Sequence, residues 1–304
     1  MKPLRLGCVK YLNARPLIRG WQDDVDFDHP SALCSKLAAG ELDLALVSSF
    51  EFLRNPTYRI VDDVSISSAG PVYSVIVAHR GDISEVEEIE LDPAAETSGN
   101  LLRCLLTEHK WKPRLVRNTD FQSVRPADIL SGVQDSADSK AAGRTGNTPM
   151  FQPFSAARLL IGDQAIRFRQ RHAGEFQFWD LGEQWNRLVG LPFVYALWLI
   201  RPEVRDFKSV ANGLRALRDE NLANLDQLIA EVVAPRMRDD PGHRKEFDPQ
   251  FCARYYREHL RFSFGEKEKE GLSEFYKRCV KQRLLPQKQL EAGAKDLDLP
   301  LRCV

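Results

Sequence analysis

Short apolar runs alternate with amphipathic, helix-like stretches over most of the chain. Strand-like runs lie at residues 42–47, 72–78 and 192–200, and the first of them ends at a pair of serines. Between such runs, leucines recur at helical spacing, as in residues 101–106. Strands that alternate with helices in this order predict a mainly parallel sheet with helices on both faces.

The same pattern sets the ends of individual elements. A first strand ends near Gly7 and runs through a turn into a helix that Pro16 opens. Ser31 is expected to cap a helix that ends at Gly40, and Thr97 or Ser98 to cap the helix of the leucine repeat. Further strands are expected at 25–28, 65–67, 89–91 and 156–161, and further helices at 50–53, 210–229, 251–260 and 270–280.

Two of the strands divide the chain. The strands at 72–78 and 192–200 enter and leave its middle block, and Asp180-Leu181-Gly182 is expected to position this hinge. A block inserted through two crossing strands predicts a two-lobed ligand clamp with its site in the cleft and hinge closure on binding. The predicted first lobe is residues 1–85 plus 200–304, and the second is residues 86–199.

Composition excludes several function classes. Lys plus Arg and Asp plus Glu both number 43, so no net field favours nucleic acid or an anionic membrane as a partner. No segment approaches the about 18 consecutive apolar residues of a membrane span, and no signal peptide is recognisable. Six scattered cysteines without a Cys-x-x-Cys pair predict reduced thiols in a cytoplasmic protein. Six histidines without an i, i+4 pair predict no metal site. The oligomeric state stays open.

The first turn carries candidate chemistry. Asn13 stands between the first strand and the helix that follows, at the position where open α/β sheets bind ligands. An amide there, in place of a charge or a glycine-rich phosphate loop, favours a small organic ligand held by hydrogen bonds. Asn13 is either such a ligand-binding amide or a turn residue.

Hydroxyl groups gather at the ends of other predicted elements. Thr97 and Ser98 open a helix, where they are either donors to a carboxylate or ordinary caps. Ser48 and Ser49 end a strand and allow the same two interpretations. Ser74 interrupts an apolar strand, so it either is satisfied internally or faces the cleft.

Six segments resemble, in order, the motifs of the chorismate dehydratases of the futalosine route to menaquinone. Each match is modest, but six in order over two thirds of the chain are specific. They are GCVKYLNARPL at 7–17, GELDLALVSSFEF at 40–52, GPVYSV at 70–75, TS at 97–98 with the leucines after it, LIGDQA at 160–165, and DLGEQW at 180–185 with GLPFVYALW at 190–198.

The resemblance implies a fold, a reaction and two alternatives. The implied fold is the two-lobed α/β fold of the type II periplasmic binding proteins. The implied reaction removes water from chorismate to give 3-[(1-carboxyvinyl)oxy]benzoate, and this lyase chemistry requires no metal or redox cofactor. The sister enzyme that makes 1,4-dihydroxy-6-naphthoate shares the fold, but its Ser-Pro-Cys-Pro-Asn-Asp type of opening motif is absent here. A non-enzymatic cytosolic sensor of small carboxylates is the other alternative.

The resemblance also implies site residues. Asn13 and Ser74 match catalytic positions that act on the leaving hydroxyl or the enolate. Asp163 is either a base or a helix cap, and no neighbouring histidine is an obvious base, so chorismate's own side-chain carboxylate is a candidate proton acceptor. The implied substrate-binding residues are Tyr11, Ser48, Ser49, Gly70, Thr97, Ser98, Gly162 and Asp163.

The chain departs from the family pattern at two places. Residues 156–158 read Ala-Ala-Arg where the family usually carries an acidic residue. Residues 130–153 are polar and rich in Ser, Ala, Asp and Gly, which predicts a flexible surface insertion. Neither departure touches the matched donors, but either can alter cleft closure or substrate preference.

Overall fold

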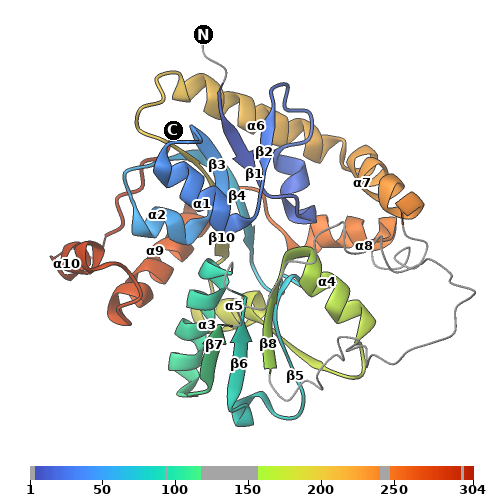
Figure 1. Ribbon diagram of the computed structural model, residues 1–304, viewed down its shortest axis with the longest axis vertical. Helices are drawn as coiled ribbons and strands as arrows, with labels where there is room; N and C mark the ends of the chain where they lie inside the picture. The colour runs from blue at the N-terminus through green and yellow to red at the C-terminus, as the bar shows by residue number, and fades with distance from the viewer. Residues whose placement is uncertain (1–3, 93–94, 118–156, 240–246, 296–297) are drawn as a thin grey trace, which may run out of the picture.

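The computed structural model describes residues 4–92, 95–117, 157–239, 247–295 and 298–304. In these residues two five-stranded sheets form two lobes, and helices cover the faces of each sheet (Figure 1). The first sheet lies in the upper half of the view and the second in the lower half. The insertion expected at 130–153 lies outside the described residues.

Each sheet contains one interior strand, the fourth in its order, that runs against its two neighbours. The first sheet has the order β2-β1-β3-β10-β4, and the second has the order β7-β6-β8-β5-β9. The strands of the first are β1 (Leu6–Cys8), β2 (Val25–Phe27), β3 (Leu44–Ser48), β4 (Arg59–Ser68) and β10 (Phe193–Ile200). Those of the second are β5 (Val75–His79), β6 (Glu88–Leu91), β7 (Arg114–Arg117), β8 (Ala157–Ile161) and β9 (Gln177–Asp180).

The prediction of a mainly parallel arrangement is right for the direction of all strands but one in each sheet, and it missed the reversed strands β10 and β5. β1 pairs in parallel with β2 and β3, and β6 with β7 and β8, but β10 is antiparallel to β3 and β4, and β5 is antiparallel to β8 and β9. The reason is the double crossing between lobes. A strand that follows a crossing starts at the boundary between the sheets and runs away from it, whereas β3, β4, β8 and β9 end there.

Helices pack on both faces of each sheet. In the first lobe, α1 packs on β3, α2 and α9 on β10, and α6 on β4, while in the second α4 packs on β8 and α5 on β5. The helices are η1 (Leu12–Leu17), α1 (Pro30–Ala39), α2 (Ser49–Arg54), η2 (Ile83–Glu85), α3 (Glu96–His109), α4 (Gly162–Arg171), α5 (Leu181–Val189), α6 (Phe207–Ala223), α7 (Leu225–Asp239), α8 (Pro249–Arg254), a π-helical turn (Tyr255–His259), α9 (Glu266–Lys281) and α10 (Gln287–Lys295).

Several predicted helix ends differ from the structure. The expected single helix at 210–229 is two helices, because the chain breaks at Asn224. α1 begins after His29 with Pro30 in its first turn, so Ser31 is not its cap, although Gly40 ends it in the left-handed conformation as expected. α3 begins after Ala95, so neither Thr97 nor Ser98 is its N-cap.

The core is continuous around β10. Every residue of this strand except Ala196 is buried, as the interior position of the strand requires. Phe193 of β10 contacts Trp185 of α5 and Phe275 of α9, with ring centroids 5.2 and 4.9 Å apart. This aromatic cluster therefore joins the second lobe to the first and to the C-terminal helices.

The carboxylate of Asp180 holds the crossing between β4 and β5. Asp180 is 2% exposed and accepts hydrogen bonds from the backbone N–H groups of Val72 (3.0 Å) and Tyr73 (2.8 Å). It also caps α5 by accepting from Gly182 and Glu183. Tyr73 has a φ of 67°, an unfavourable left-handed conformation for a non-glycine residue. The expectation that Asp180-Leu181-Gly182 positions the hinge is confirmed by these bonds.

Sheet membership differs from the predicted lobe limits. β5 belongs to the second sheet, although residues up to 85 were expected in the first lobe. β10 belongs to the first sheet, although residues up to 199 were expected in the second. The two crossings therefore lie at residues 69–74 and 181–192, each earlier in the chain than the predicted limit.

Replacing Asp180 is expected to destabilise the fold strongly. An Asp180→Asn side chain has one acceptor oxygen in place of two, so buried N–H groups lose their partner. We expect the free energy of unfolding to fall by about 3 kcal/mol. Urea titration followed by circular dichroism measures this loss as a lower midpoint. Asp24→Asn, at an exposed aspartate, is the matched control. Equal midpoints for the two variants would show that Asp180 does not hold the crossing.

Candidate active site

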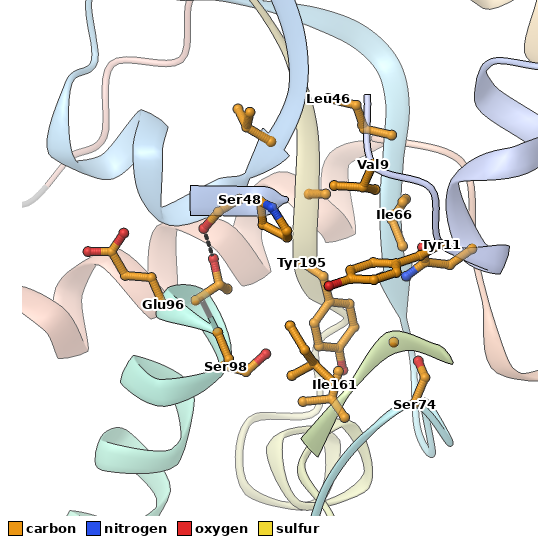
Figure 2. Close-up of a pocket in the computed structure, with 18 of the residues that line it drawn as sticks. Val9, Tyr11, Leu46, Ser48, Ile66, Ser74, Glu96, Ser98, Ile161 and Tyr195 are labelled. Atoms are coloured by element: carbon orange, nitrogen blue, oxygen red, sulfur yellow. Dashed lines mark hydrogen bonds between the residues drawn. The ribbon is translucent and has the colours of Figure 1, made fainter. Parts of the chain in front are cut away.

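A cavity of about 90 Å³ lies between the two sheets. The ends of β3 and β8, the turn after β1 and the first turns of α3 and α4 contribute to its wall. Figure 2 shows Tyr11, Ser48, Ser74 and Ser98 arranged around it. Because the cavity lies at the carboxyl ends of strands from both sheets, it occupies the position that α/β sheets use for ligands.

The structure brings most of the predicted site residues to this cavity. Ser49, Gly70 and Asp163 do not line it. Ser49 is buried and donates its hydroxyl to the Val194 carbonyl (2.7 Å), and the carbonyl of Gly70 accepts from Ser68 (3.2 Å). The predicted residues that line the cavity are Tyr11, Asn13, Ser48, Ser74, Thr97, Ser98 and Gly162.

The turn from Tyr11 to Asn13 forms one wall and is held from two sides. Asp163 accepts a hydrogen bond from the Leu12 N–H (2.8 Å), so the carboxylate neither caps α4 nor faces the cavity. Tyr256 donates its hydroxyl to the Leu12 carbonyl (2.8 Å). Both bonds are buried. The backbone that carries Asn13 is therefore fixed by groups from the second lobe and from the C-terminal segment.

The Asn13 amide has an unused acceptor. Its Oδ1 atom is buried, and no described residue donates a hydrogen bond to it. A buried polar atom without a partner costs about 1–3 kcal/mol, and native proteins keep few of them. The atom belongs to a residue of the cavity wall. Asn13 is therefore equipped to accept a hydrogen bond from a ligand hydroxyl.

Ser48 and Thr97 join the lobes across the cavity. Their hydroxyls are hydrogen-bonded to each other, which Figure 2 shows as a dashed line beside Ser48. Thr97 also accepts from the Phe50 N–H (3.3 Å) at the start of α2. The Thr97 hydroxyl thus serves α2 of the opposite lobe, which explains why it does not cap its own helix. The neighbouring Ser98 side chain points toward the cavity (Figure 2).

Gly162 allows a close approach between the lobes. It has a φ of +58°, and a Cβ atom on it would lie 3.1 Å from the Tyr11 ring. Its N–H donates to the Ser74 carbonyl (2.8 Å). A larger residue would have to displace Tyr11 and strain the backbone. Burial, with the nearby Asp92 and Asp163, raises the pKa of Tyr11, so its phenol stays neutral in the cavity wall.

Three tyrosines of the site were absent from the predicted set. Tyr195 lines the cavity, and its hydroxyl is 3.1 Å from Ser68 Oγ. Burial, with the nearby Asp180, raises its pKa well above the ordinary value. A tyrosine hydroxyl within an otherwise apolar strand was a signal from which the sequence could have predicted a site residue. Tyr255 and Tyr256 lie beyond the matched motifs in a stretch that reads only as a helix, so they had no such signal.

Neutral donors dominate the cavity wall. Among the described residues that line it, Glu96 is the one acid, and no Lys, Arg or His takes part. The Glu96 carboxylate is ion-paired with Arg54 and points away from the cavity in Figure 2. Negative charge on a ligand would therefore meet hydroxyls, an amide and the N-termini of α3 and α4, whose first N–H groups and dipoles favour anions.

Behind this wall lies a buried acid. Glu51 is 4% exposed, and burial raises its pKa to about 7. Arg54, 3.5 Å away, opposes this shift, and Glu96 adds to it. Arg54 sits between the two carboxylates and so links α2 of the first lobe to α3 of the second.

A family model described as menaquinone biosynthesis matches residues 4–134 and 147–281. The chain belongs to this menaquinone biosynthesis family. A curated relative, the chorismate dehydratase of Thermus thermophilus, is 28% identical over 295 residues, which cover 90% of this chain and 94% of the relative.

Solved structures show the fold of this menaquinone biosynthesis protein. Protein AF1704 from Archaeoglobus fulgidus has a TM-score of 0.65 at 18% identity, covering 92% of this chain and 98% of that one. The periplasmic aliphatic sulphonate binding protein SsuA from Escherichia coli has a TM-score of 0.57 at 12% identity, covering 94% and 89%. A Candida albicans protein described as having the generic periplasmic binding protein fold has a TM-score of 0.57 at 10% identity, covering 97% and 96%. The predicted periplasmic-binding-protein-like fold is confirmed.

In the described part of this menaquinone biosynthesis protein, no three His, Cys, Asp or Glu side chains are grouped so that they could hold a metal ion. None of its helices has the length and apolar character needed to cross a membrane.

The raised pKa of Glu51 predicts how stability depends on pH. The folded protein keeps a proton on Glu51 up to about pH 7, whereas the unfolded chain releases it near the ordinary value of 4.5. This contribution to stability is therefore complete below pH 4.5 and is lost as the pH rises to 7. Relative to Glu51→Gln, wild type should lose about 3 kcal/mol across that window in urea titrations. Exposed Glu41→Gln is the control, and equal pH slopes for Glu51→Gln and wild type would refute the assignment.

Proposed function

We propose that this protein is a chorismate dehydratase, a hydro-lyase that removes water from chorismate to give 3-[(1-carboxyvinyl)oxy]benzoate. The observation that carries the proposal is the convergence of motif-matched donors from both lobes on one cavity. The curated relative from Thermus thermophilus, itself a chorismate dehydratase, supports the choice of substrate.

The chemistry of chorismate sets what the site must do. The proton on the ether-bearing ring carbon is vinylogously acidic, because the ring carboxylate is conjugated with the adjacent double bond. Loss of this proton places negative charge on the ring carboxylate. Departure of the neighbouring hydroxyl then leaves an aromatic ring, and the proton and the hydroxide together make the water that is lost. The site must therefore bind two carboxylates and assist one leaving hydroxyl.

The two helix N-termini are suited to the carboxylates. α3 presents the N–H groups of its first turn and the Ser98 hydroxyl at the cavity. α4 begins at Gly162, which lines the cavity and lies against the ring of Tyr11 from the first lobe. Donors that are already in place when charge develops stabilise the transition state without reorganisation, and one such donor contributes about 2.7–4 kcal/mol.

Asn13 and Ser74 are assigned to the leaving hydroxyl and the developing enolate. The unpartnered Asn13 Oδ1 suits a hydroxyl hydrogen of the substrate. Ser74 Oγ accepts from the Tyr255 hydroxyl at 2.7 Å, so its own hydrogen remains to be donated to a substrate oxygen. An acceptor and a donor on one cavity wall can orient a hydroxyl group and then hydrogen-bond it as it leaves.

The proton acceptor is assigned to the substrate. Among the described residues of the cavity wall, the carboxylate of Glu96 is paired with Arg54 and turned away, and the Asp163 carboxylate holds Leu12 outside the cavity. The side-chain carboxylate of chorismate is attached through the ether oxygen next to the acidic C–H group. It is therefore close enough to take the proton in an intramolecular step, which benefits from a high effective concentration.

Purified protein is expected to convert chorismate to an aromatic product. Loss of the diene absorbance follows the substrate, and mass spectrometry identifies the product by the loss of one water. Asn13→Ala and Ser74→Ala should each lower kcat about 10²–10³-fold, because each removes one preorganised hydrogen-bonding group.

Matched controls separate chemistry from folding. Asn212→Ala and Ser35→Ala make the same changes at exposed positions and should retain the wild-type rate and melting temperature. Binding of chorismate without turnover by wild type would overturn the proposal in favour of a carboxylate sensor. Wild-type rates in both site variants would overturn the roles of Asn13 and Ser74.

A further inference from the structure

Tyr255 is a buried residue whose hydroxyl contacts the candidate catalytic residue Ser74. None of the matched motifs contains it. It begins the turn that follows α8 and is fully buried. Its ring stacks on Phe251, with a centroid distance of 5.7 Å and an interplanar angle of 12°. The C-terminal segment thus places one rigid phenol directly behind Ser74, in the wall of a cavity that is lined by residues 9–196.

The Tyr255 hydroxyl contacts Ser74. It donates a hydrogen bond of 2.7 Å to Ser74 Oγ, and both groups are buried. In the described part of the chain, no other group is hydrogen-bonded to Ser74 Oγ. A serine hydroxyl has one hydrogen and two acceptor lone pairs. With one lone pair occupied by Tyr255, the serine hydrogen is free to point to the cavity that Ser74 lines.

The direction of this bond is stable to pH. Burial raises the pKa of Tyr255 well above its ordinary value, the bond to Ser74 lowers it less, and Asp163 and Asp180 raise it further. The phenol therefore keeps its proton at neutral and moderately alkaline pH. Tyr255 serves as a constant donor, and Ser74 Oγ is kept as its acceptor.

We infer that Tyr255 is a positioning residue that orients the Ser74 hydroxyl as a hydrogen-bond donor to the substrate oxygen at the reacting ring. This inference rests on the proposed function and extends it to a residue outside the matched motifs. Without the phenol, the Ser74 hydroxyl can rotate and donate elsewhere, so part of the preorganisation is lost while the binding surface keeps its shape.

Tyr255→Phe tests this role because it removes one hydroxyl and keeps the ring. We expect kcat for chorismate dehydration to fall about 10-fold and KM to change less than 3-fold, since a donor that acts mainly in the transition state affects kcat. Tyr58→Phe is the matched control. Tyr58 is a buried tyrosine with its own hydrogen bond, to Asn55, and the cavity wall does not include it.

A double-mutant cycle with Ser74→Ala separates positioning from general stability. If Tyr255 acts through Ser74, Tyr255→Phe should have no further effect on kcat in the Ser74→Ala background. If the fold-changes in kcat of the two single variants multiply in the double variant, the inference is overturned, because Tyr255 then acts independently of Ser74. All rates are measured below the onset of thermal unfolding of each variant, so a lower melting temperature does not enter the comparison.

The remaining outcomes separate the two claims. Wild-type protein that leaves chorismate unchanged overturns the proposed function, and the inference falls with it. Wild-type turnover with an unchanged kcat in Tyr255→Phe overturns the inference alone. A KM rise without a fall in kcat also overturns it, because that result assigns Tyr255 to the shape of the cavity instead of the orientation of Ser74.

Discussion

The buried carboxylate of Asp180 is the constraint on which the two-lobed arrangement depends. Val72 and Tyr73 lie on the crossing from the first sheet to the second, and α5 lies on the return. One side chain therefore satisfies N–H groups from both crossings, which would otherwise be buried without partners. Because the chain crosses between the sheets here, β5 and β10 both start at the boundary between the sheets. The other strands around the cavity end there, and their terminal residues form its wall.

Polar side chains also join the two lobes near the cavity. Ser48 bonds to Thr97 in the cavity wall, and Asp163 bonds to the Leu12 N–H behind it, so each bridge joins one lobe to the other. Arg54 adds an ion pair to Glu96. Of these bridges, the bond between Ser48 and Thr97 is the one made by residues that line the cavity and could bind a ligand. The same two hydroxyls therefore join the lobes and face the cavity, the arrangement that a hinge-type clamp requires.

The local sequence pattern was sufficient to predict the end of an element where a single residue sets that end. Gly40 ends α1 with a positive φ, and the change from apolar residues to Ser48 marks the end of β3. The motif-matched donors also reached one cavity, because strand ends meet at one edge of a sheet. Strand direction in β10 was not predictable in this way, since it depends on where the chain re-enters the first sheet. The role of Thr97 was missed as well, because its partner Phe50 lies on a helix of the opposite lobe.

The contact between Tyr255 and Ser74 shows why the rest of a site escapes local reasoning. The two residues are 181 positions apart, and neither has a sequence neighbour that indicates the other. Their pairing follows from the fold, which returns the C-terminal segment to the lobe boundary. A cavity wall without lysine, arginine or histidine among its described residues must stabilise negative charge by the direction of neutral dipoles. Direction, unlike charge, is set by second partners such as Tyr255, so the chemistry of this wall depends on residues behind it.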